Sequence, residues 1–332
     1  MPTPPTIDDL YAAAERIKPQ IRTTPLLESA HINEMCGGRV LIKAEPLQRT
    51  GSFKFRGAFN TLSQLGDEAI SGGVVAYSSG NHAQGVAAAA QILGLSAVII
   101  MPEDAPAIKV ANTRSYGAEV VTYNRYSDSR EHIGATISEQ RGAVLIKPYD
   151  DPRIIAGQGT VGLEITEQAQ ALGVVPDAVL VPCGGGGLIS GTALAIRHGM
   201  PRTEVYSVEP ANYDDTRQSL DAGTRKSVDV SVPSICDALL APTPGELTFS
   251  INKALLAGGL AVSDNHARAA MYHAFERLKL VVEPGGAVAL AAAISGQYAC
   301  AGKTVCVVCS GGNVDGDLYS QILSAGPSMD TP

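Results

Sequence analysis

Short apolar runs alternate with longer amphipathic segments along most of the chain. The first amphipathic segment has helical spacing, opens at Thr6 and runs to about Lys18. From Gly73 onward the alternation is regular and predicts strands separated by helices. In this stretch the predicted strands cover residues 74–77, 97–101, 119–123 and 144–146, and the predicted helices cover residues 83–93, 107–116 and 129–141. Strands separated by helices of this length indicate parallel βαβ units, so residues 73–148 can form a compact lobe of their own.

A second, less regular series follows this lobe. Its predicted strands cover residues 178–181, 204–208 and 304–309, and its predicted helices cover residues 158–171, 187–198, 263–278 and 285–294. Before the lobe the pattern predicts a short strand at 40–43 and a helix at 55–65, and residues 210–250 carry little pattern. A chain of 332 residues is too long for one small core, so we expect two domains, or one large α/β domain with a lobe.

The composition is that of an ordinary globular protein, with 45% hydrophobic and 17% charged residues. A net charge of −8 and the lack of a basic run argue against a nucleic-acid partner. The most apolar long run, from Gly85 to Met101, is interrupted by Gln91 and Gly94, so it predicts a helix and a strand rather than a membrane span. Residues 1–5 have neither the basic nor the apolar region of a signal peptide, which favours a cytoplasmic location.

Six cysteines in a chain without a signal sequence indicate reduced thiols rather than a disulfide framework. Cys306 and Cys309 form a C-x-x-C pair, but they lie in the run 304–309, which is predicted to be a strand. An odd separation in a strand puts the two side chains on opposite faces of the sheet. The pattern therefore argues against a redox or metal-binding role for this pair.

The first candidate for chemistry is a lysine between two phenylalanines, in the segment Gly51-Ser52-Phe53-Lys54-Phe55-Arg56-Gly57. Apolar neighbours disfavour an ammonium ion and lower the pKa of a lysine. A lysine that is partly neutral near pH 7 can attack a carbonyl group and form a Schiff base. The alternative is a surface lysine whose alkyl chain packs on aromatic rings, and these seven residues alone favour that alternative.

Four consecutive glycines, Gly184-Gly185-Gly186-Gly187, lie between a predicted strand and a predicted helix. Residues without Cβ allow backbone N–H groups to converge on an anion at a helix N-terminus, which is how a phosphate is bound. A merely flexible loop is less favoured at this position. The spacing of the glycines also matches part of the dinucleotide fingerprint, with Glu209 in the place of the ribose-binding acid. Ser190 stands where the third glycine belongs, so this match is weak.

Polar residues follow two further predicted strands. Ser78-Ser79-Gly80-Asn81-His82 follows the strand at 74–77, at its carboxyl end, where α/β sheets bind ligands. Hydroxyls, an amide and helix N-terminal N–H groups suit a carboxylate, although Ser and Asn are also favoured helix N-caps. Ser310-Gly311-Gly312-Asn313 follows the strand at 304–309. Its serine hydroxyl can bond a ring nitrogen, while the simpler interpretation is a glycine-rich turn.

A candidate cation site lies in the segment Glu209-Pro210-Ala211-Asn212-Tyr213-Asp214-Asp215. Carboxylates and a backbone carbonyl over seven residues can bind a hard cation. Acidic loops are common on protein surfaces, so the segment taken alone favours an acidic turn.

Together these segments supply a nucleophilic lysine, a phosphate-binding loop, a carboxylate-binding loop and a partner for a ring nitrogen. These are the needs of an enzyme that uses pyridoxal phosphate on an amino acid. The motifs and their order resemble those of the serine/threonine dehydratase and serine racemase family, in the tryptophan-synthase-β-like, fold type II class of pyridoxal phosphate enzymes. The resemblance covers the chain from about Thr24 to Asp315.

The resemblance implies two open, twisted, mainly parallel sheets flanked by helices, with the cofactor in the cleft between two domains. Residues 1–72 and 149–332 would form a large cofactor-binding domain, and residues 73–148 a smaller, mobile, inserted domain that binds the substrate carboxylate. The implied reaction is the elimination of water from a β-hydroxy amino acid, by default L-threonine or L-serine, which gives a 2-oxo acid and ammonia. A homodimer is also implied.

The resemblance also implies roles for single residues. Lys54 would form the Schiff base with the cofactor and abstract the α-proton, and Phe53 would pack on the cofactor ring. Asn81 would contact the ring 3′-oxygen and Ser310 the ring nitrogen. The cofactor phosphate would be held by Gly184, Gly185, Gly186 and Gly187. The substrate would be bound by Ser78, Ser79, Asn81, His82 and Arg130. A magnesium or calcium ion would be bound by Glu209, the Tyr213 carbonyl and Asp215.

Two departures from the family pattern leave the substrate open. Lys147 stands where ordinary threonine dehydratases have a histidine, and its charge would suit the second carboxylate of 3-hydroxyaspartate, unless it points to solvent. Ala238 replaces a glycine near the ring 3′-oxygen. A 3-hydroxyaspartate dehydratase is therefore an alternative. So is a serine or aspartate racemase, in which Ser79 would exchange the α-proton on the face opposite Lys54. From another class, a non-catalytic or redox nucleotide-binding protein built on the glycine loop is a third alternative.

Overall fold

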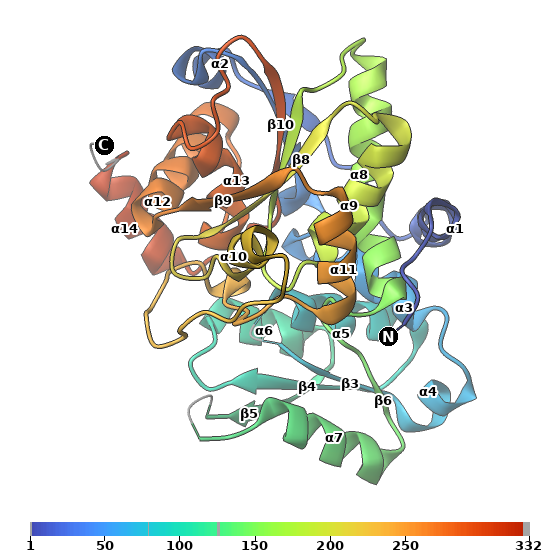
Figure 1. Ribbon diagram of the computed structural model, residues 1–332. Helices are drawn as coiled ribbons and strands as arrows, with labels where there is room; N and C mark the ends of the chain where they lie inside the picture. The colour runs from blue at the N-terminus through green and yellow to red at the C-terminus, as the bar shows by residue number, and fades with distance from the viewer. Residues whose placement is uncertain (1, 79, 125–126, 328–332) are drawn as a thin grey trace.

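The computed structural model describes residues 2–78, 80–124 and 127–327. Within these residues the strands form two separate sheets, which Figure 1 shows one above the other. The larger sheet is built from β1 (Leu26–Glu28), β2 (Arg39–Ala44), β7 (Ala178–Pro182), β8 (Glu204–Pro210), β9 (Gly258–Val262) and β10 (Thr304–Cys309). Their order across the sheet is β1-β2-β10-β7-β8-β9, and only the β1–β2 pair is antiparallel.

Both faces of the larger sheet are covered by helices. In β10, Val305, Val307 and Cys309 pack against α12 (Asp264–His273) and α13 (Pro284–Ile294). Cys306 and Val308 face the opposite core, with α8 (Pro152–Ala171) and α9 (Gly187–Gly199). A strand buried on both faces is apolar at every position, which explains the unbroken apolar run of β10. Cys306 and Cys309 lie on opposite faces, as predicted.

The smaller sheet has the strand order β5-β4-β3-β6 and is parallel throughout. Its strands are β3 (Val74–Tyr77), β4 (Ala97–Pro102), β5 (Glu119–Tyr123) and β6 (Val144–Leu145). Helix α7 (Arg130–Arg141) covers the outer face, while α5 (Asn81–Leu93) and α6 (Ala107–Ser115) cover the face toward the larger sheet (Figure 1). The small buried residues of α5, including Ala83 and Ala87–Ala90, let it pack between its own sheet and α3 (Lys54–Leu62). The two sheets confirm the predicted α/β fold.

Several elements differ from the sequence prediction. Helix α8 begins at Pro152 rather than at 158, because Asp151 caps it and Pro152 takes a first-turn position, where a missing N–H costs nothing. The segment 263–278 divides into α12 and a π-helical turn at Ala274–Leu278, and β6 ends at Leu145. The pattern did not predict several shorter elements: α2 (Ala30–Cys36), α4 (Asp67–Gly72), α10 (Asp215–Ala222), α11 (Glu246–Leu255), β9 and α14 (Gly316–Ala325).

Strand β9 shows why such elements escape a pattern search. It begins with Gly258-Gly259, and glycine is a poor strand former. A Cβ on Gly259 would lie 2.8 Å from the Arg217 Cβ, so the packing of α10 against this edge of the sheet requires glycine. The helix α1 (Ile7–Ile17), by contrast, follows its amphipathic pattern and carries the capping box of Thr6 and Asp9.

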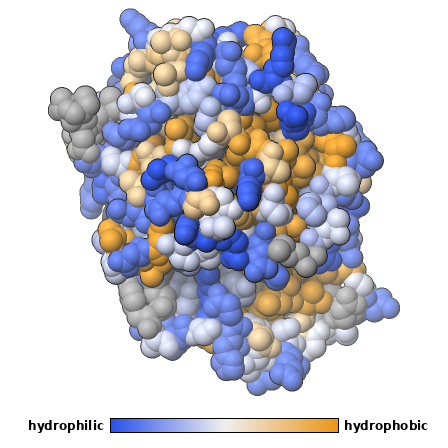
Figure 2. All heavy atoms as spheres, viewed as in Figure 1, coloured by the Kyte–Doolittle hydropathy of each residue, from blue (hydrophilic) through white to orange (hydrophobic). Residues whose placement is uncertain are grey.

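None of the helices in the described ranges combines the length and the apolar character needed to cross a membrane. On the face seen in Figure 2, hydrophobic and hydrophilic residues are interspersed.

Candidate active site

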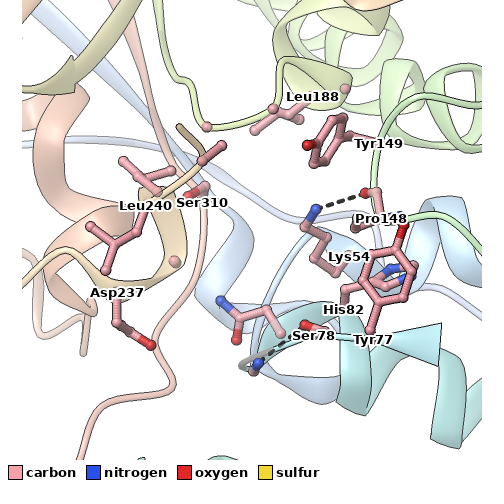
Figure 3. Close-up of a pocket in the computed structure, with 18 of the residues that line it drawn as sticks. Lys54, Tyr77, Ser78, His82, Pro148, Tyr149, Leu188, Asp237, Leu240 and Ser310 are labelled. Atoms are coloured by element: carbon pink, nitrogen blue, oxygen red, sulfur yellow. Dashed lines mark hydrogen bonds between the residues drawn. The ribbon is translucent and has the colours of Figure 1, made fainter. Parts of the chain in front are cut away.

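A cavity lies between the two sheets, and Figure 3 shows part of its lining. Its walls come from residues at and after the carboxyl ends of strands in both sheets, including Ser78 after β3, Gly184–Gly187 after β7 and Ser310 after β10. Because parallel strands end at the same edge of a sheet, loops far apart in sequence converge there. The cavity therefore stands where α/β folds bind ligands.

Lys54 is the first residue of α3, and its side chain extends into this cavity (Figure 3). Its Nζ donates to the Pro148 carbonyl at 3.0 Å. Burial lowers the pKa of Lys54 to about 8, so an appreciable fraction of the amine is neutral near pH 7. The backbone before it is fixed, because Phe53 N donates to the Ser310 carbonyl at 3.1 Å and Ser52 bridges to Gly311.

The two phenylalanines beside Lys54 have different environments. Phe53 lines the cavity, and the Lys54 Nζ lies 5.2 Å from the centre of its ring. Phe55 is fully buried in the core and stacks on Phe59 at 5.7 Å between ring centroids. Only Phe53 can therefore contact a ligand.

The four glycines form the turn between β7 and α9, and all of them line the cavity. Gly186 has φ +95°, which an L side chain rarely adopts. A Cβ on Gly185 would lie 2.3 Å from the Tyr149 ring, and a Cβ on Gly187 would lie 2.6 Å from the Gln158 Oε1. No side chain caps α9, so its first N–H groups are free to bind an anion.

The loop after β3 brings Ser78, Asn81 and His82 to the cavity, while Ser79 lies outside the described residues. Burial, helped by the charge of Lys54, lowers the pKa of His82 to about 3. His82 is therefore neutral at pH 7. Its Nδ1 is buried and has no hydrogen-bond partner in the part of the chain that the structure describes. The Gly80 N–H donates to the Ser78 Oγ at 3.1 Å, a bond drawn in Figure 3.

The Asn81 side chain is held by two others. Its Nδ2 donates to the Glu283 Oε1 at 2.5 Å, and its Oδ1 accepts from the Asn313 Nδ2 at 2.8 Å. Asn313 also donates to the Thr50 carbonyl at 2.8 Å. These bonds fix the orientation of the Asn81 amide, since the nitrogen faces a carboxylate and the oxygen faces an amide donor.

A buried ion cluster that was not predicted from the sequence lies at this cavity. The Lys109 Nζ, from α6, lies 2.7 Å from the Asp237 Oδ2 and 2.8 Å from the Glu283 Oε2. Its alkyl chain packs on the loop after β3, because a Cβ on Gly80 would lie 2.3 Å from the Lys109 Cδ. Lys109 thus links α6, which packs on the smaller sheet, to Asp237 and Glu283, which lie in the part of the chain that forms the larger sheet. No motif marks it, because its partners lie 128 and 174 positions further along the sequence.

Two further residues singled out from the sequence lie at the wall of this cavity. Ser310 lines the cavity directly after β10, and its N–H donates to the Gly286 carbonyl at 3.2 Å. Ala238 also lines the cavity, in the short 3₁₀ turn Asp237–Leu239. The structure therefore brings both residues to the same cavity as Lys54.

The two cationic residues predicted to contact the substrate have different positions in the structure. Arg130, the first residue of α7, lines the cavity, and its guanidinium lies 5.3 Å from the centre of the Tyr77 ring. Lys147 is exposed and is not among the residues that line the cavity. Of these two residues, Arg130 is therefore the one that can bring a positive charge to the cavity.

The three residues predicted to bind a cation lie away from the cavity lining. The Glu209 carboxylate accepts from the N–H groups of Thr216 and Arg217, each at 2.9 Å. Both oxygens of the Asp215 carboxylate are buried and lack a hydrogen-bond partner within the described residues. The Tyr213 hydroxyl donates to the carbonyls of Val230 and Val232, at 3.2 and 3.0 Å.

A model of the family described as "Pyridoxal-phosphate dependent enzyme" matches residues 17–311. The chain belongs to this family. It is 43% identical over 329 residues to the L-threo-3-hydroxyaspartate ammonia-lyase of Saccharomyces cerevisiae, covering 98% of this chain and 99% of the relative. It is 44% identical to the serine racemase of Schizosaccharomyces pombe, covering 96% of this chain and 98% of the relative. Among solved structures, the serine racemase of maize matches with a TM-score of 0.90 and 39% identity, over 97% of this chain and 98% of that chain.

Membership of this family confirms the resemblance and the implied use of pyridoxal phosphate, and it excludes the interpretation as a nucleotide-binding protein of another class. Relatives with three different reactions in their names match at similar identity. The choice of reaction and substrate must therefore come from the site itself.

Proposed function

We propose that the chain is a pyridoxal phosphate-dependent ammonia-lyase that eliminates water from a β-hydroxy amino acid. The products are a 2-oxo acid and ammonia. One observation carries the proposal: a single cavity brings together a half-buried lysine of lowered pKa, an uncapped glycine turn and the loop after β3. These parts supply a nucleophile, an anion site and a second set of polar groups.

The cavity fits the cofactor. Lys54 would bind the cofactor through its amine, and the N–H groups of Gly184–Gly187 would bind its phosphate. The tight contacts of these glycines with Tyr149 and Gln158 leave the backbone itself as the wall of the cavity. Ser310 would face the ring nitrogen, and Asn81 the 3′-oxygen, with Phe53 against the ring. These assignments follow the places of the residues around the cavity and the resemblance.

When bound, pyridoxal phosphate supplies an electron-withdrawing ring that acidifies the α-hydrogen of an amino acid. Lys54 would accept that proton, since an amine with a pKa of about 8 is a suitable base near neutral pH. The N-terminus of α5, together with Ser78 and His82, would bind the α-carboxylate. The Ser310 hydroxyl is uncharged and does not hold a proton on a ring nitrogen as a carboxylate does. This favours prompt loss of the β-hydroxyl over slow exchange at Cα.

L-Threonine and L-serine are the default substrates, and Arg130 favours a substrate with a second carboxylate. Its guanidinium stands at the cavity beside Tyr77, Tyr123 and Tyr149, whose side chains also line it. A guanidinium can bind a carboxylate through two parallel hydrogen bonds. The name of the Saccharomyces cerevisiae relative, L-threo-3-hydroxyaspartate ammonia-lyase, agrees with such a substrate. We therefore propose 3-hydroxyaspartate as the second candidate substrate, with Arg130 rather than Lys147 as the contact.

The cofactor and the reaction are tested together. The purified protein, incubated with pyridoxal phosphate and desalted, should be yellow and release 2-oxo acid from at least one of L-serine, L-threonine and the 3-hydroxyaspartate diastereomers. Lys54→Ala should lower the rate at least about 1000-fold, because it removes the base and the covalent contact. Lys18→Ala, which changes a lysine directly after α1 whose side chain is 73% exposed, is the matched control. A colourless protein, or an undiminished rate in Lys54→Ala, contradicts the proposal.

The proposal of a substrate with a second carboxylate is tested by substituting two arginines of the same helix. Arg130→Met should raise KM for 3-hydroxyaspartate by about 100-fold and leave KM for L-serine within about threefold, because a charged hydrogen-bonded pair contributes about 1.5–3 kcal/mol. Arg141→Met is the control, since Arg141 lies at the other end of α7 and pairs with Glu119 at 2.7 Å. Equal effects of Arg130→Met on both substrates would remove the argument for a dicarboxylate.

Racemisation is the competing reaction, and it depends on Ser79. If Ser79 exchanges the α-proton on the face opposite Lys54, chiral chromatography should detect D-serine in incubations with L-serine. Ser79→Ala should then abolish D-serine formation while 2-oxo acid release continues. Absence of D-serine from the parent protein would leave elimination as the only reaction.

We also propose that Mg²⁺ or Ca²⁺ binds beside Glu209, the Tyr213 carbonyl and Asp215. The support is the buried Asp215 carboxylate without a hydrogen-bond partner in the described residues, because a buried charge without a partner is costly. No group of three or more His, Cys, Asp and Glu side chains in those residues is arranged to hold a metal. Carbonyl oxygens would have to complete the site, as hard cations accept. Calorimetric titration with Ca²⁺ should show one site, and Asp215→Asn should lose it.

We further propose a homodimer in the cytoplasm, with residues 73–148 as a small mobile domain. The resemblance supports the dimer, and six free thiols suit a reducing compartment. The smaller sheet lies entirely within residues 74–145 and has its own core of Val75, Val98 and Ile100 against α7, which supports an independent domain. Light scattering of the eluted protein measures the dimer directly.

A further inference from the structure

Two cysteines that are far apart in sequence meet at the corner opposite the cavity. Cys36 ends α2, and Cys300 lies in the loop between α13 and β10. Figure 1 shows α2 at the top of the molecule, beside the red loop that leads into β10. Neither residue lines the cavity or takes part in the proposed reaction.

The two segments are held together by their backbones. Gly302 N donates to the Gly37 carbonyl at 3.0 Å, and Arg39 N donates to the Lys303 carbonyl at 2.8 Å. A Cβ on Gly38 would lie 2.0 Å from the Cys300 carbonyl oxygen, so only glycine allows this approach. The backbone segments that follow the two cysteines are therefore in fixed contact, which keeps Cys36 and Cys300 close to each other.

Cys36 packs against the buried cluster that contains Cys300, and the interaction of the two neighbouring thiols raises the pKa of Cys36 and lowers the pKa of Cys300. The Cys300 Sγ also donates to the Tyr298 carbonyl at 3.5 Å. The charge of Lys303 also lowers the pKa of Cys300. Cys300 is 3% exposed, whereas Cys36 is half-buried, so the pair reaches the surface through Cys36. A thiol of lowered pKa beside a second thiol and a lysine is in the environment of a reactive cysteine.

The other four cysteines lack this environment. Burial raises the pKa of Cys306 and of Cys309 to about 12, and it also raises the pKa of the other two, Cys183 and Cys236. Buried thiols of raised pKa are inert toward oxidants. These four cysteines therefore serve as an internal control for the oxidation of Cys36 and Cys300.

We propose that Cys36 and Cys300 form a disulfide when the protein meets a hydroperoxide, while the other four cysteines stay reduced. The Cys300 thiolate attacks one peroxide oxygen, the O–O bond breaks, and the leaving hydroxide takes up a proton to become water. The sulfenic acid on Cys300 is then attacked by the Cys36 sulfur, whose proton leaves with the sulfenic hydroxyl as a second water. Two thiols are oxidised by two electrons in total, and one hydroperoxide is reduced.

The small size of hydrogen peroxide suits a thiolate that is almost fully buried. The bond would close a loop of more than 260 residues, and a cross-link over a long loop restricts the unfolded chain strongly. We therefore expect the oxidised protein to unfold at a temperature about 5 °C higher. The cross-link lies outside the cavity, so enzymatic activity should stay unchanged.

The test uses the reduced, full-length protein and hydrogen peroxide. After exposure, the protein is unfolded, alkylated with N-ethylmaleimide and digested for mass spectrometry. We expect four alkylated cysteines instead of six, one cross-linked peptide pair that contains Cys36 and Cys300, and full reversal by dithiothreitol. In Cys36→Ser the cross-link should vanish, and dimedone should trap the sulfenic acid on Cys300.

Three outcomes would overturn the proposal. They are six alkylatable thiols after exposure, a cross-link that joins other cysteines or two chains, and Cys300 oxidised beyond sulfenic acid in the parent protein while Cys36 stays reduced. The measurement on the parent protein needs no variant to fold. It is also independent of the proposed activity, so a failed substrate assay would leave it standing.

Discussion

Replacing Lys109 with methionine tests whether the ion cluster positions the substrate loop. The change keeps the length of the alkyl chain that packs beside Gly80 and removes only the charge. It leaves the carboxylates of Asp237 and Glu283 without the cation that lies 2.7 and 2.8 Å from them. Glu283 also accepts from Asn81, so the loss reaches the loop that is proposed to bind cofactor and substrate.

The magnitude follows from burial. Lys109 and Glu283 are each 1% exposed, while the Asp237 side chain is 27% exposed and partly screened by water. Removing one partner of a buried ion pair costs about 3–5 kcal/mol, because the remaining charge is left uncompensated. With one of the two carboxylates partly solvated, we take the lower end, about 3 kcal/mol. If this cost falls on the active arrangement of the substrate loop rather than on overall folding, kcat/KM should fall by about 100-fold, at about 1.4 kcal/mol for each factor of ten.

The loss should also depend on pH. Burial raises the pKa of Glu283, and the charge of Lys109 opposes that rise. Without Lys109 the pKa of Glu283 rises further, so the ionised form becomes costly and the protonated form is tolerated. The deficit of Lys109→Met should therefore be smaller at low pH and grow as the pH rises. A purely structural defect would lower activity equally at all pH values.

The assay is 2-oxo acid release, with the absorbance of bound cofactor and thermal unfolding measured on the same samples. Glu283→Gln in the Lys109→Met background removes the stranded charge and keeps an oxygen that accepts from Asn81, so it should recover part of the activity. Lys18→Met, at an exposed position directly after α1, should match the parent protein. Activity of Lys109→Met within threefold of the parent, or strictly additive losses in the double variant, would refute the reasoning.

Three further predictions concern the cofactor and cation sites. Recombination of the apoprotein with pyridoxal phosphate should speed up as the pH rises through about 8, because only the neutral Lys54 amine attacks; a flat stopped-flow profile would contradict this. Burial raises the pKa of Asp215 from 3.8 to about 7, so without divalent cations up to about 4 kcal/mol of stability should be lost as the pH rises from about 4 to above 7. Calorimetry should show Mg²⁺ restoring it at pH 8 but not at pH 5; equal Mg²⁺ effects at the two pH values would count against the site. Gly186→Ala, with φ +95° and a Cβ 2.9 Å from the Thr248 Cβ, should weaken cofactor binding about 10-fold to 100-fold in equilibrium dialysis. Gly173→Ala, at φ +66° in open space, is its control, and equal losses in both variants would mean that backbone strain alone explains the effect.

Much of the architecture could be predicted because it is local. Strands β3, β4, β5 and β7 and the helices between them follow from apolar periodicity, since each must bury one face or both against its neighbours. The glycine turn and Lys54 could be found for a similar reason, because a phosphate loop and a reactive lysine have specific local requirements. The elements missed, such as β9 with its two glycines, owe their conformation to partners elsewhere in the chain.

The candidate site also has parts that could be predicted from local sequence and parts that depend on distant residues. The pattern along the chain predicted a reactive lysine between two phenylalanines, and a glycine loop and two polar turns at strand ends, and the resemblance gave them a cofactor. Only the tertiary structure showed that Arg130, not Lys147, faces the cavity, because that depends on how α7 and the segment after β6 are directed.

Burial and charge pairing were also decided by the tertiary structure. The pKa of Lys54 is lowered because segments from distant parts of the chain partly remove it from water, and two phenylalanines beside it in the sequence could not establish this. Lys109 meets Glu283, and Cys36 meets Cys300, across separations of more than 170 residues. Electrostatic and thiol contacts act over a few ångströms in space, and sequence patterns report neighbours along the chain. Such pairs therefore exist only once the fold has brought their segments together.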